Sequence, residues 1–160
     1  MAIKEGDVIP DVKLTEMVDG KPSQVSLADL SRGKRVVVFA VPGAFTPTCS
    51  MKHLPGFVDQ DKALRAKGAD EVVCISVNDA FVMDAWGKSS SAGGKVRMLA
   101  DGNGEFTRAV GLAFDGSGFG MGERSQRYAM ILKDGRVEKL LVEPGPGLNA
   151  SSADSVLSHL

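Results

Sequence analysis

One stretch, residues 35–50, restricts the possible folds of this chain more than any other part of the sequence. Residues 35–41, Arg-Val-Val-Val-Phe-Ala-Val, form an apolar run that is rich in β-branched side chains and ends at a proline, a pattern typical of a buried strand. Two prolines and a glycine then exclude regular structure until Cys49, and the residues after Cys49 suit a helix. The sequence therefore predicts a cysteine in the first turn of a helix, just beyond the carboxyl end of a central strand.

Further strands and helices alternate after this stretch. Residues 71–77 and 96–100 are apolar runs that predict strands, and helical patterns occupy residues 49–67, 80–86 and 105–110. Strands with continuous rather than alternating apolar residues are covered on both faces of a sheet. The order of elements therefore predicts an α/β architecture with helices on both sides.

The predicted helix after Cys49 has one apolar side, but a proline and a glycine interrupt its sequence. Its candidate inward positions are Leu54, Phe57, Val58 and Leu64. Pro55 and Gly56 lie between them, and a proline removes a backbone donor and clashes with the preceding turn. We therefore expect this helix to kink or split near Pro55.

Two Asp-Gly pairs, at residues 19–20 and 134–135, predict hairpins, because both residues of such a pair tolerate the positive φ of a tight turn. The first gives an N-terminal β-hairpin within residues 12–27, and the second joins residues 126–133 to residues 137–142. A sheet that combines parallel strands with antiparallel hairpins, flanked by helices, resembles a thioredoxin-like fold.

Two segments in the second half carry weaker signals. Residues 115–122 contain four alternating glycines without the G-x-G-x-x-G spacing of a dinucleotide site, so we interpret them as a flexible surface loop. Ser151-x-x-Asp154 has the pattern of a capping box, which predicts a final helix that ends at Leu160. At 160 residues, the chain is expected to form one domain, residues 1–160.

The composition excludes several classes of function. With 19 basic and 20 acidic residues the net charge is -1, which gives no electrostatic reason to bind nucleic acid or an anionic membrane. No apolar run is long enough to span a bilayer, and no apolar leader begins the chain, so a cytoplasmic protein is expected unless a targeting peptide has been removed from it. Cys49 and Cys74 are the only cysteines, too few for a disulfide framework and too far apart for Cys-x-x-Cys. The sequence predicts no metal site and no cofactor.

Cys49 is the principal candidate for chemistry. A helix N-terminus and nearby cations can lower a cysteine pKa from about 8.5 to about 3.5–7.5, which favours the nucleophilic thiolate. Thr46, three residues earlier, carries a hydroxyl that can bond the backbone, the thiol or a bound oxygen, and Pro42 stiffens the loop. The alternative, an inert cysteine beside a proline-rich turn, remains open from these residues alone.

The two histidines invite a different interpretation. His53 lies four residues after Cys49, on the same side of the predicted helix, as in a Cys-His dyad. A surface or packing histidine is the favoured alternative, because Pro55 disturbs this turn and a hydrolase needs a third orienting group. His159 lies in the C-terminal turn, where no role is expected.

Three further residues have both a structural and a functional interpretation. Cys74, inside an apolar strand, is by default a core residue, but it could be a resolving thiol that condenses with oxidised Cys49. Arg124 and Arg127 are by default exposed charges. Either could instead point at the thiolate and hold it as a planar cation that does not titrate.

The segment Pro-Gly-Ala-Phe-Thr-Pro-Thr-Cys-Ser, residues 42–50, resembles the active-site motif of peroxiredoxins. Its continuation through residues 51–56 is similar to the type-II, peroxiredoxin-five-like subclass familiar from plants. The likeness extends through residues 74–79, through residues 124–128 and to the Ser-Ser-Ala-Asp tail that begins at residue 151, so it covers essentially the whole chain.

This resemblance implies a thiol-specific peroxidase that reduces hydrogen peroxide and alkyl hydroperoxides in redox homeostasis and defence against oxidative stress. It implies that Cys49 is the peroxidatic nucleophile and becomes a sulfenic acid. Thr46 and Arg127, with the Cys49 N–H, match the groups that bind the peroxide oxygens, and Pro42 matches the wall of the pocket. Cys74 matches the second, resolving cysteine of the subclass. Reduction by glutaredoxin–glutathione or thioredoxin and a homodimer are implied in the same way.

Two rival functions make different predictions. A Cys-His hydrolase requires His53, whereas a peroxidase requires Cys49 and is expected to keep most of its activity in a His53→Ala variant. A redox sensor or holdase would use oxidation of Cys49 to change partners. Catalytic peroxide turnover with a reductant present would exclude that as the only role.

Overall fold

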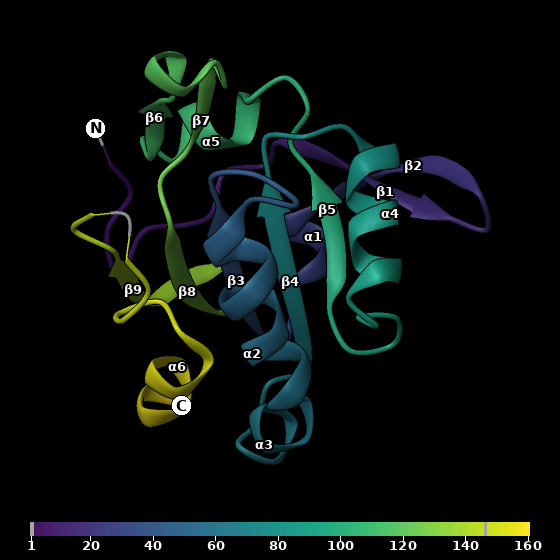
Figure 1. Cartoon of the computed structure of the whole chain (residues 1–160). Coiled ribbons are helices and arrows are strands. Elements are labelled where there is room, and N and C mark those ends of the chain that lie inside the picture. The colour runs from purple at the N-terminus through teal and green to yellow at the C-terminus, as the bar shows by residue number, and fades with distance from the viewer. Residues whose placement is uncertain (1, 146) are drawn as a thin grey trace.

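The chain is built around a seven-stranded mixed sheet, seen in the computed structural model, which describes residues 2–145 and 147–160 (Figure 1). The strand order is β2-β1-β5-β4-β3-β8-β9, and a separate two-stranded sheet contains β6 and β7. The strands are β1 (Lys13–Val18), β2 (Lys21–Ser26), β3 (Arg35–Val41), β4 (Glu71–Ser76), β5 (Arg97–Ala100), β6 (Ala113–Asp115), β7 (Glu123–Ser125), β8 (Tyr128–Lys133) and β9 (Arg136–Val142).

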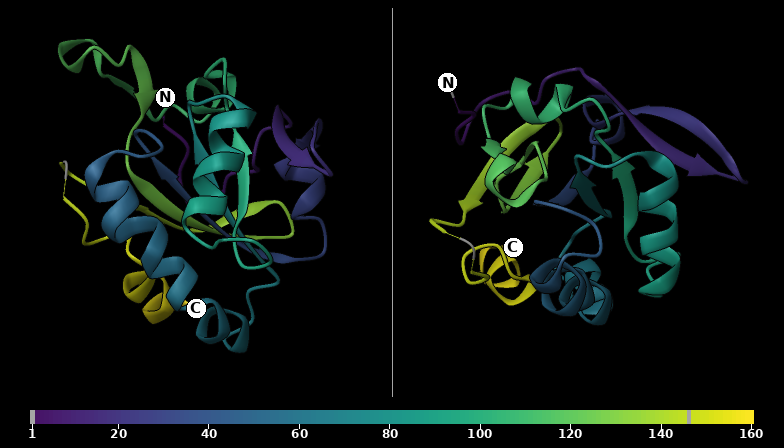
Figure 2. Two further views of the ribbon diagram at one scale, coloured as in Figure 1. Left: turned by 45° about the vertical axis from the view of Figure 1, so that its right-hand side comes forward. Right: turned by 45° about the horizontal axis from the view of Figure 1, so that its top comes forward.

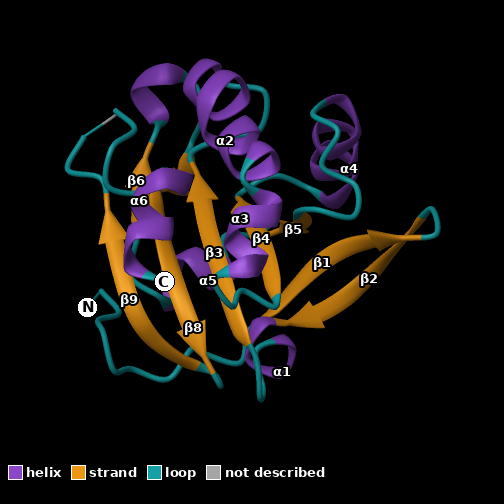
Figure 3. Ribbon diagram, turned by 90° about the horizontal axis from the view of Figure 1, so that it is seen from below, coloured by secondary structure: helices purple, strands orange, loops and turns teal. Residues whose placement is uncertain are grey.

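Helices cover both faces of this sheet, as the views in Figure 1 and Figure 3 show. The helical segments are α1 (Leu27–Leu30), η1 (Cys49–His53), α2 (Leu54–Asp59), α3 (Asp61–Ala66), α4 (Ala80–Ser89), α5 (Glu105–Ala109), the short η2 (Ser117–Phe119) and α6 (Ala153–His159). The predicted α/β fold with a central mixed sheet and an N-terminal hairpin is confirmed. Among the described residues, no helix combines the length and the apolarity that crossing a membrane requires.

Strand β3 lies inside the sheet, parallel to β4 on one side and antiparallel to β8 on the other. Its alternate residues enter different cores: Val37 and Phe39 pack with α2, α4 and α6, whereas Val36 and Val38 pack with α1 and α5. Both faces are therefore buried, which explains why this run is continuously apolar.

Both Asp-Gly turns form as predicted. Asp19 and Gly20 have φ values of 51° and 79°, and Asp134 and Gly135 have values of 50° and 81°. Positive φ at both central residues matches the right-handed twist of the flanking strands. The first turn joins β1 to β2, and the second joins β8 to β9.

The helix after Cys49 is irregular where Pro55 was expected to disturb it. Residues Cys49–His53 form a π-helical turn in which the Leu54 N–H donates to the Cys49 carbonyl, one residue further back than in an α-helix. Pro55 then stands in the first turn of α2, where its missing N–H costs least. A second break, at Gln60 between α2 and α3, was not predicted.

In the second half of the chain, one prediction was confirmed in part and another was wrong. Residues 115–122 lie mostly at the surface, as expected of a surface loop, and connect β6 to β7 through η2 in a small hairpin that projects from the main sheet (Figure 2). The cap of the final helix is Ser152 rather than Ser151, because the Ser152 hydroxyl accepts from the Ser155 N–H. Ser151 is instead fully buried.

Candidate active site

The register of the central strands brings distant residues to one edge of the sheet. Because β8 runs antiparallel to β3, with Ala40 opposite Tyr128, the start of β8 lies beside the end of β3. The side chain of Tyr128 faces the α1–α5 core, so its neighbour Arg127 faces the other side, toward the helix that begins near Cys49. This topology explains how residues 78 positions apart meet.

Cys49 and Arg127 form the centre of the candidate site. The Arg127 Nη2 donates to the Cys49 Sγ at 3.2 Å. The cysteine side chain is fully buried and the arginine is 7% exposed. A guanidinium in a buried site stays charged and stabilises an adjacent thiolate more strongly than it would in water.

His53 is part of this site but does not contact the sulfur. Its Nδ1 lies 2.9 Å from the Arg127 Nη1, and its Nε2 lies 2.9 Å from the Ser151 carbonyl oxygen. A guanidinium can only donate and a carbonyl can only accept, so Nδ1 is the acceptor and Nε2 carries the proton. Burial, opposed by the Ser151 bond and aided by the Arg127 charge, lowers the pKa of His53 to about 3.

This geometry corrects the expectation for His53 in one respect. The residue is not at the surface but fully buried, stacked obliquely on Phe39 with ring centroids 4.9 Å apart. Both ring nitrogens are engaged with groups other than Cys49. The arrangement is therefore not a Cys-His dyad, and the favoured packing interpretation describes it better.

The loop before Cys49 is a strained turn. The Thr46 hydroxyl donates to the Gly43 carbonyl at 2.7 Å, which leaves the lone pairs of its oxygen to accept another hydrogen bond. Phe45 has a φ of 63°, an unusual value for a bulky aromatic residue. Such strain persists only where the surroundings hold the backbone firmly.

Two groups outside the loop supply that support. Asn78, just beyond β4, accepts hydrogen bonds from the Ala44 N–H at 3.0 Å and from the Ser76 hydroxyl at 2.6 Å. On the other side of Cys49, the buried Trp86 indole donates to the Ser50 hydroxyl at 3.0 Å. The polypeptide is thus fixed on both sides of the sulfur.

A cavity of about 380 Å³ lies beside these groups. Pro42 and Arg127 form part of its wall, together with the apolar rings of Phe114 and Phe119. A larger cavity, of about 570 Å³, lies between β1, β5 and α4 and touches none of the predicted site residues. The smaller cavity therefore has the better position to receive a substrate for Cys49.

Known proteins that resemble this chain identify its family. The model of the redoxin family matches residues 4–157. Peroxiredoxin-2B of Arabidopsis thaliana is 46% identical over 159 residues, which cover 99% of this chain and 98% of that protein. The chain is a peroxiredoxin.

Solved structures agree in fold. A reduced Prx3 from Vibrio vulnificus in complex with hydrogen peroxide has 46% identity and a TM-score of 0.94, with 98% of each chain covered. A protein from Burkholderia cenocepacia described as a putative thioredoxin reductase has 50% identity and a TM-score of 0.97, covering 100% of this chain and 99% of that one. The predicted family and its type-II subclass, with the thioredoxin-like fold, are confirmed, and the enzyme is a thiol peroxidase that uses peroxide and a thiol reductant.

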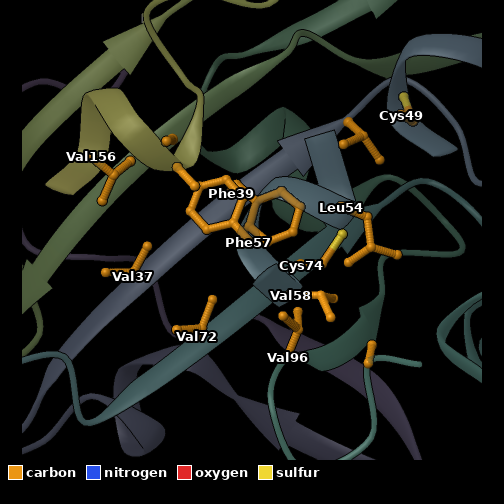
Figure 4. Close-up of a cluster of buried hydrophobic side chains, with 14 of the residues drawn as sticks. Val37, Phe39, Cys49, Leu54, Phe57, Val58, Val72, Cys74, Val96 and Val156 are labelled. Carbon is orange, nitrogen blue, oxygen red and sulfur yellow. The ribbon is translucent and has the colours of Figure 1, made fainter. Parts of the chain in front are cut away.

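The second cysteine of this peroxiredoxin lies in the core. Cys74 is fully buried in β4, opposite Phe39 and Met98 of the neighbouring strands. Figure 4 shows it among the packed side chains, with Cys49 at the edge of the cluster. Burial, with a smaller contribution from Cys49, raises the pKa of the Cys74 thiol, and the two thiols are not joined.

The two remaining candidates, Arg124 and His159, do not contact the sulfur. Arg124 donates to the Met121 carbonyl at 2.9 Å and makes a long contact of 3.5 Å with the Pro42 carbonyl, so it supports the pocket wall rather than the sulfur. His159 is exposed in α6, away from the site. The sequence contains no signal for Asn78 or for the buried pair of Ser151 and Glu143. No local pattern distinguishes these residues.

Proposed function

We propose that Cys49 is the peroxidatic nucleophile of this thiol peroxidase. The observation that carries the proposal is the 3.2 Å contact between the Cys49 Sγ and the Arg127 guanidinium inside a buried site. A fixed positive charge beside a cysteine favours the thiolate, which is the reactive form. We propose Thr46, Arg127 and Pro42 as the other members of the site.

In the first step, the thiolate attacks the terminal oxygen of a hydroperoxide. The S–O bond forms as the O–O bond breaks, so the sulfur is oxidised by two electrons to a sulfenic acid. The other oxygen leaves as an alkoxide, or as hydroxide from hydrogen peroxide, and takes a proton to become alcohol or water. Negative charge therefore moves from the sulfur toward the leaving oxygen during the reaction.

The surrounding groups suit this movement of charge. Arg127 has a buried Nε that finds no acceptor within residues 2–145 and 147–160, so one donor remains for a peroxide oxygen. The Thr46 oxygen can accept from the peroxide O–H, and the Cys49 N–H can donate. Donors already aligned in a buried site stabilise charge without reorganising, a contribution typical of oxyanion holes. Pro42 excludes water from one side.

The test is to identify the oxidised atom. Stoichiometric hydrogen peroxide should add one oxygen to Cys49, detected by mass spectrometry after a sulfenic-acid trap, and the Cys49→Ser variant should neither trap nor consume peroxide. Trapping on Cys74 in the wild type, with none on Cys49, would refute the assignment.

We further propose that Cys74 resolves the sulfenic acid by forming an intrachain disulfide and releasing water. Strand β4 is hydrogen-bonded on both sides, to β3 and β5, so the movement must come from the helical segment that carries Cys49. A Cys49–Cys74 disulfide after one equivalent of peroxide is the expected product. Only a sulfenic acid or a glutathione adduct would imply a one-cysteine cycle.

The reductant and the cellular setting are proposed from the resemblance. Glutaredoxin–glutathione or thioredoxin would reduce the oxidised enzyme, and a comparison of both systems on wild type and Cys74→Ser separates them.

A homodimer, in which the exposed Phe45 and Phe81 near α4 could be covered, is tested by sedimentation. We also propose one domain over residues 1–160 and a cytoplasmic location, tested by cooperative unfolding and by cell fractionation.

Two other activities fit less well. A Cys-His hydrolase needs an imidazole nitrogen facing the sulfur, but both nitrogens of His53 are occupied. A reductase that draws electrons from a dinucleotide would be consistent with the description of the Burkholderia protein, but residues 115–122 lack the dinucleotide spacing. Peroxide-dependent oxidation of added thiols, without oxidation of a nicotinamide by the protein alone, distinguishes the peroxidase from both.

A further inference from the structure

Arg127 is held from two directions by residues that follow β9. The Glu143 N–H donates to the Arg127 carbonyl at 3.0 Å, which continues the β8–β9 pairing by one step and fixes the backbone of the arginine. The guanidinium is fixed separately, through His53. Both connections begin at Glu143, the first at its backbone N–H and the second at its side chain.

The side chain of Glu143 gathers three donors on one oxygen. Its Oε2 accepts from the Asn149 N–H at 2.8 Å, from the Ser151 N–H at 2.7 Å and from the Ser151 hydroxyl at 2.7 Å. The residue is only 6% exposed. Burial alone would raise the pKa of Glu143, but the bonds from Ser151 and from the Asn149 and Ala150 N–H groups outweigh it, and the pKa is lowered.

These bonds orient Ser151, and Ser151 orients His53. With its N–H and its hydroxyl both directed at Glu143, Ser151 presents its carbonyl to the His53 Nε2 at 2.9 Å. That bond places the proton of the imidazole on Nε2 and leaves Nδ1 to accept from Arg127. An uninterrupted chain of hydrogen bonds therefore runs from a carboxylate in the C-terminal part of the chain to the guanidinium beside Cys49.

We propose that Glu143 is a positioning residue for Arg127 and acts through Ser151 and His53. The proposal rests on the proposed function of Cys49 and goes beyond it. Glu143 lines the cavity beside Pro42 and Arg127, but its Oε2 is bonded to Asn149 and Ser151 and makes no contact with the sulfur. The position of Glu143 also suits an electrostatic role. The carboxylate of Glu143, the guanidinium of Arg127 and the thiolate of Cys49 would form a row of alternating charges in one buried region. Such charged networks are strongest where they are least hydrated.

The chemistry explains why a carboxylate is needed there. One carboxylate oxygen accepts several hydrogen bonds, and bonds to a charged acceptor are about twice as strong as neutral ones. A glutamine offers a neutral oxygen to the same donors, so it keeps the shape of the site and weakens the bonds. Weaker bonds leave Ser151 and His53 freer to move, and Arg127 with them.

The experiment measures the second-order rate constant for hydrogen peroxide by stopped-flow fluorescence. Trp86 is the only tryptophan, and its bond to Ser50 places it next to the reacting residue. Glu143→Gln should lower the rate constant about tenfold, similar to the loss of an outer hydrogen-bond partner that orients a metal ligand. Glu138→Gln, on β9 but in an exposed ion pair with Arg35, is the matched control and should leave it unchanged.

A double-variant cycle separates positioning from general loosening. His53→Leu interrupts the chain of bonds and should itself lower the rate, unlike the small loss that the sequence alone led us to expect for His53→Ala. Glu143→Gln should then have no further effect on the rate in that background. His53→Gln keeps one donor and one acceptor and should retain the effect of Glu143→Gln.

Failure of the positioning role and failure of the proposed function give different results. A wild-type rate in Glu143→Gln, or equal effects of this change in the His53→Leu and wild-type backgrounds, would overturn the positioning role while Cys49 remains peroxidatic. No reaction of the wild type with peroxide would instead overturn the proposed function. If Glu143→Gln does not fold, Ser151→Ala, which removes one of the three donors and keeps the carbonyl, must lower the rate in the wild-type background but not in His53→Leu.

Discussion

His53 should make the folded protein lose stability in mild acid. The structure holds the imidazole neutral, fully buried between Arg127 and Ser151, with its pKa lowered to about 3. In the unfolded chain a histidine has a pKa of about 6.5. Between these two values the unfolded state binds a proton that the folded state excludes, so stability falls as the pH falls through this window.

The size of the effect follows from the width of that window. Each pH unit below about 6.5 costs about 1.4 kcal/mol for one such group. From there to about pH 4 the loss is therefore about 3 kcal/mol, a substantial part of the roughly 5–15 kcal/mol that stabilises a domain. Below about pH 3 the folded imidazole also becomes protonated, and the loss from this group levels off.

His53→Gln is the matched variant for the assay. The glutamine amide can accept from Arg127 and donate to the Ser151 carbonyl, as the imidazole does, but it does not titrate. Urea unfolding of both proteins at several pH values gives the free energy of unfolding of each. The lowered pKa of Glu143 also reduces stability in acid, because protonation is unfavourable in the folded state. That contribution is common to both proteins and cancels in the difference.

The difference between the two proteins should change by about 3 kcal/mol between about pH 7 and about pH 4, with the wild type losing more. Parallel curves would show that the folded and unfolded states bind the His53 proton equally well, and that burial does not lower its pKa. The imidazole resonance that disappears in His53→Gln provides an independent check. It should not titrate near neutral pH in the folded wild type.

Three further substitutions separate support of the site from general stability. Trp86→Phe removes the indole donor to Ser50 and should lower the free energy of unfolding by about 1–3 kcal/mol in urea; no change would mean that this bond is not formed. Asn78→Ala leaves the Ala44 N–H without its acceptor and should lower both the stability, by a similar amount, and the rate with peroxide, because the strained turn before the nucleophile relaxes. Asp101→Asn weakens the buried cap that accepts three hydrogen bonds at the start of α5. It should reduce stability while leaving the peroxide rate unchanged, and a slower rate would show that the two cores are coupled.

Much of the fold could be predicted because its signals are local. The apolar run of β3, the Asp-Gly turns and the glycine and prolines before Cys49 each restrict the backbone within a few residues. The second half was harder to predict. Nothing near Ser151 indicates that its hydroxyl bonds Glu143 across the fold while Ser152 takes the capping position.

The site also contains residues with local sequence signals and residues whose role depends on distant parts of the chain. Cys49 and Thr46 are close in sequence, and the chemistry of a helix start pointed to them directly. Arg127 was chosen by resemblance to a family, since its place depends on β8 pairing antiparallel with β3. His53 was visible as the residue one turn after Cys49, but the partner that gives it a role, Arg127, lies on a distant strand. The contact between His53 and Arg127 could be predicted only with knowledge of the register between β3 and β8.

The rate constant for the reaction between hydrogen peroxide and the reduced protein shows whether Arg127 activates Cys49. We expect Arg127→Gln, which keeps the side chain polar but removes its charge, to lower this rate constant by about 100- to 1,000-fold, and Arg35→Gln at the opposite end of β3 to leave it unchanged. Equal rates in wild type and Arg127→Gln would contradict the claim that Arg127 activates Cys49.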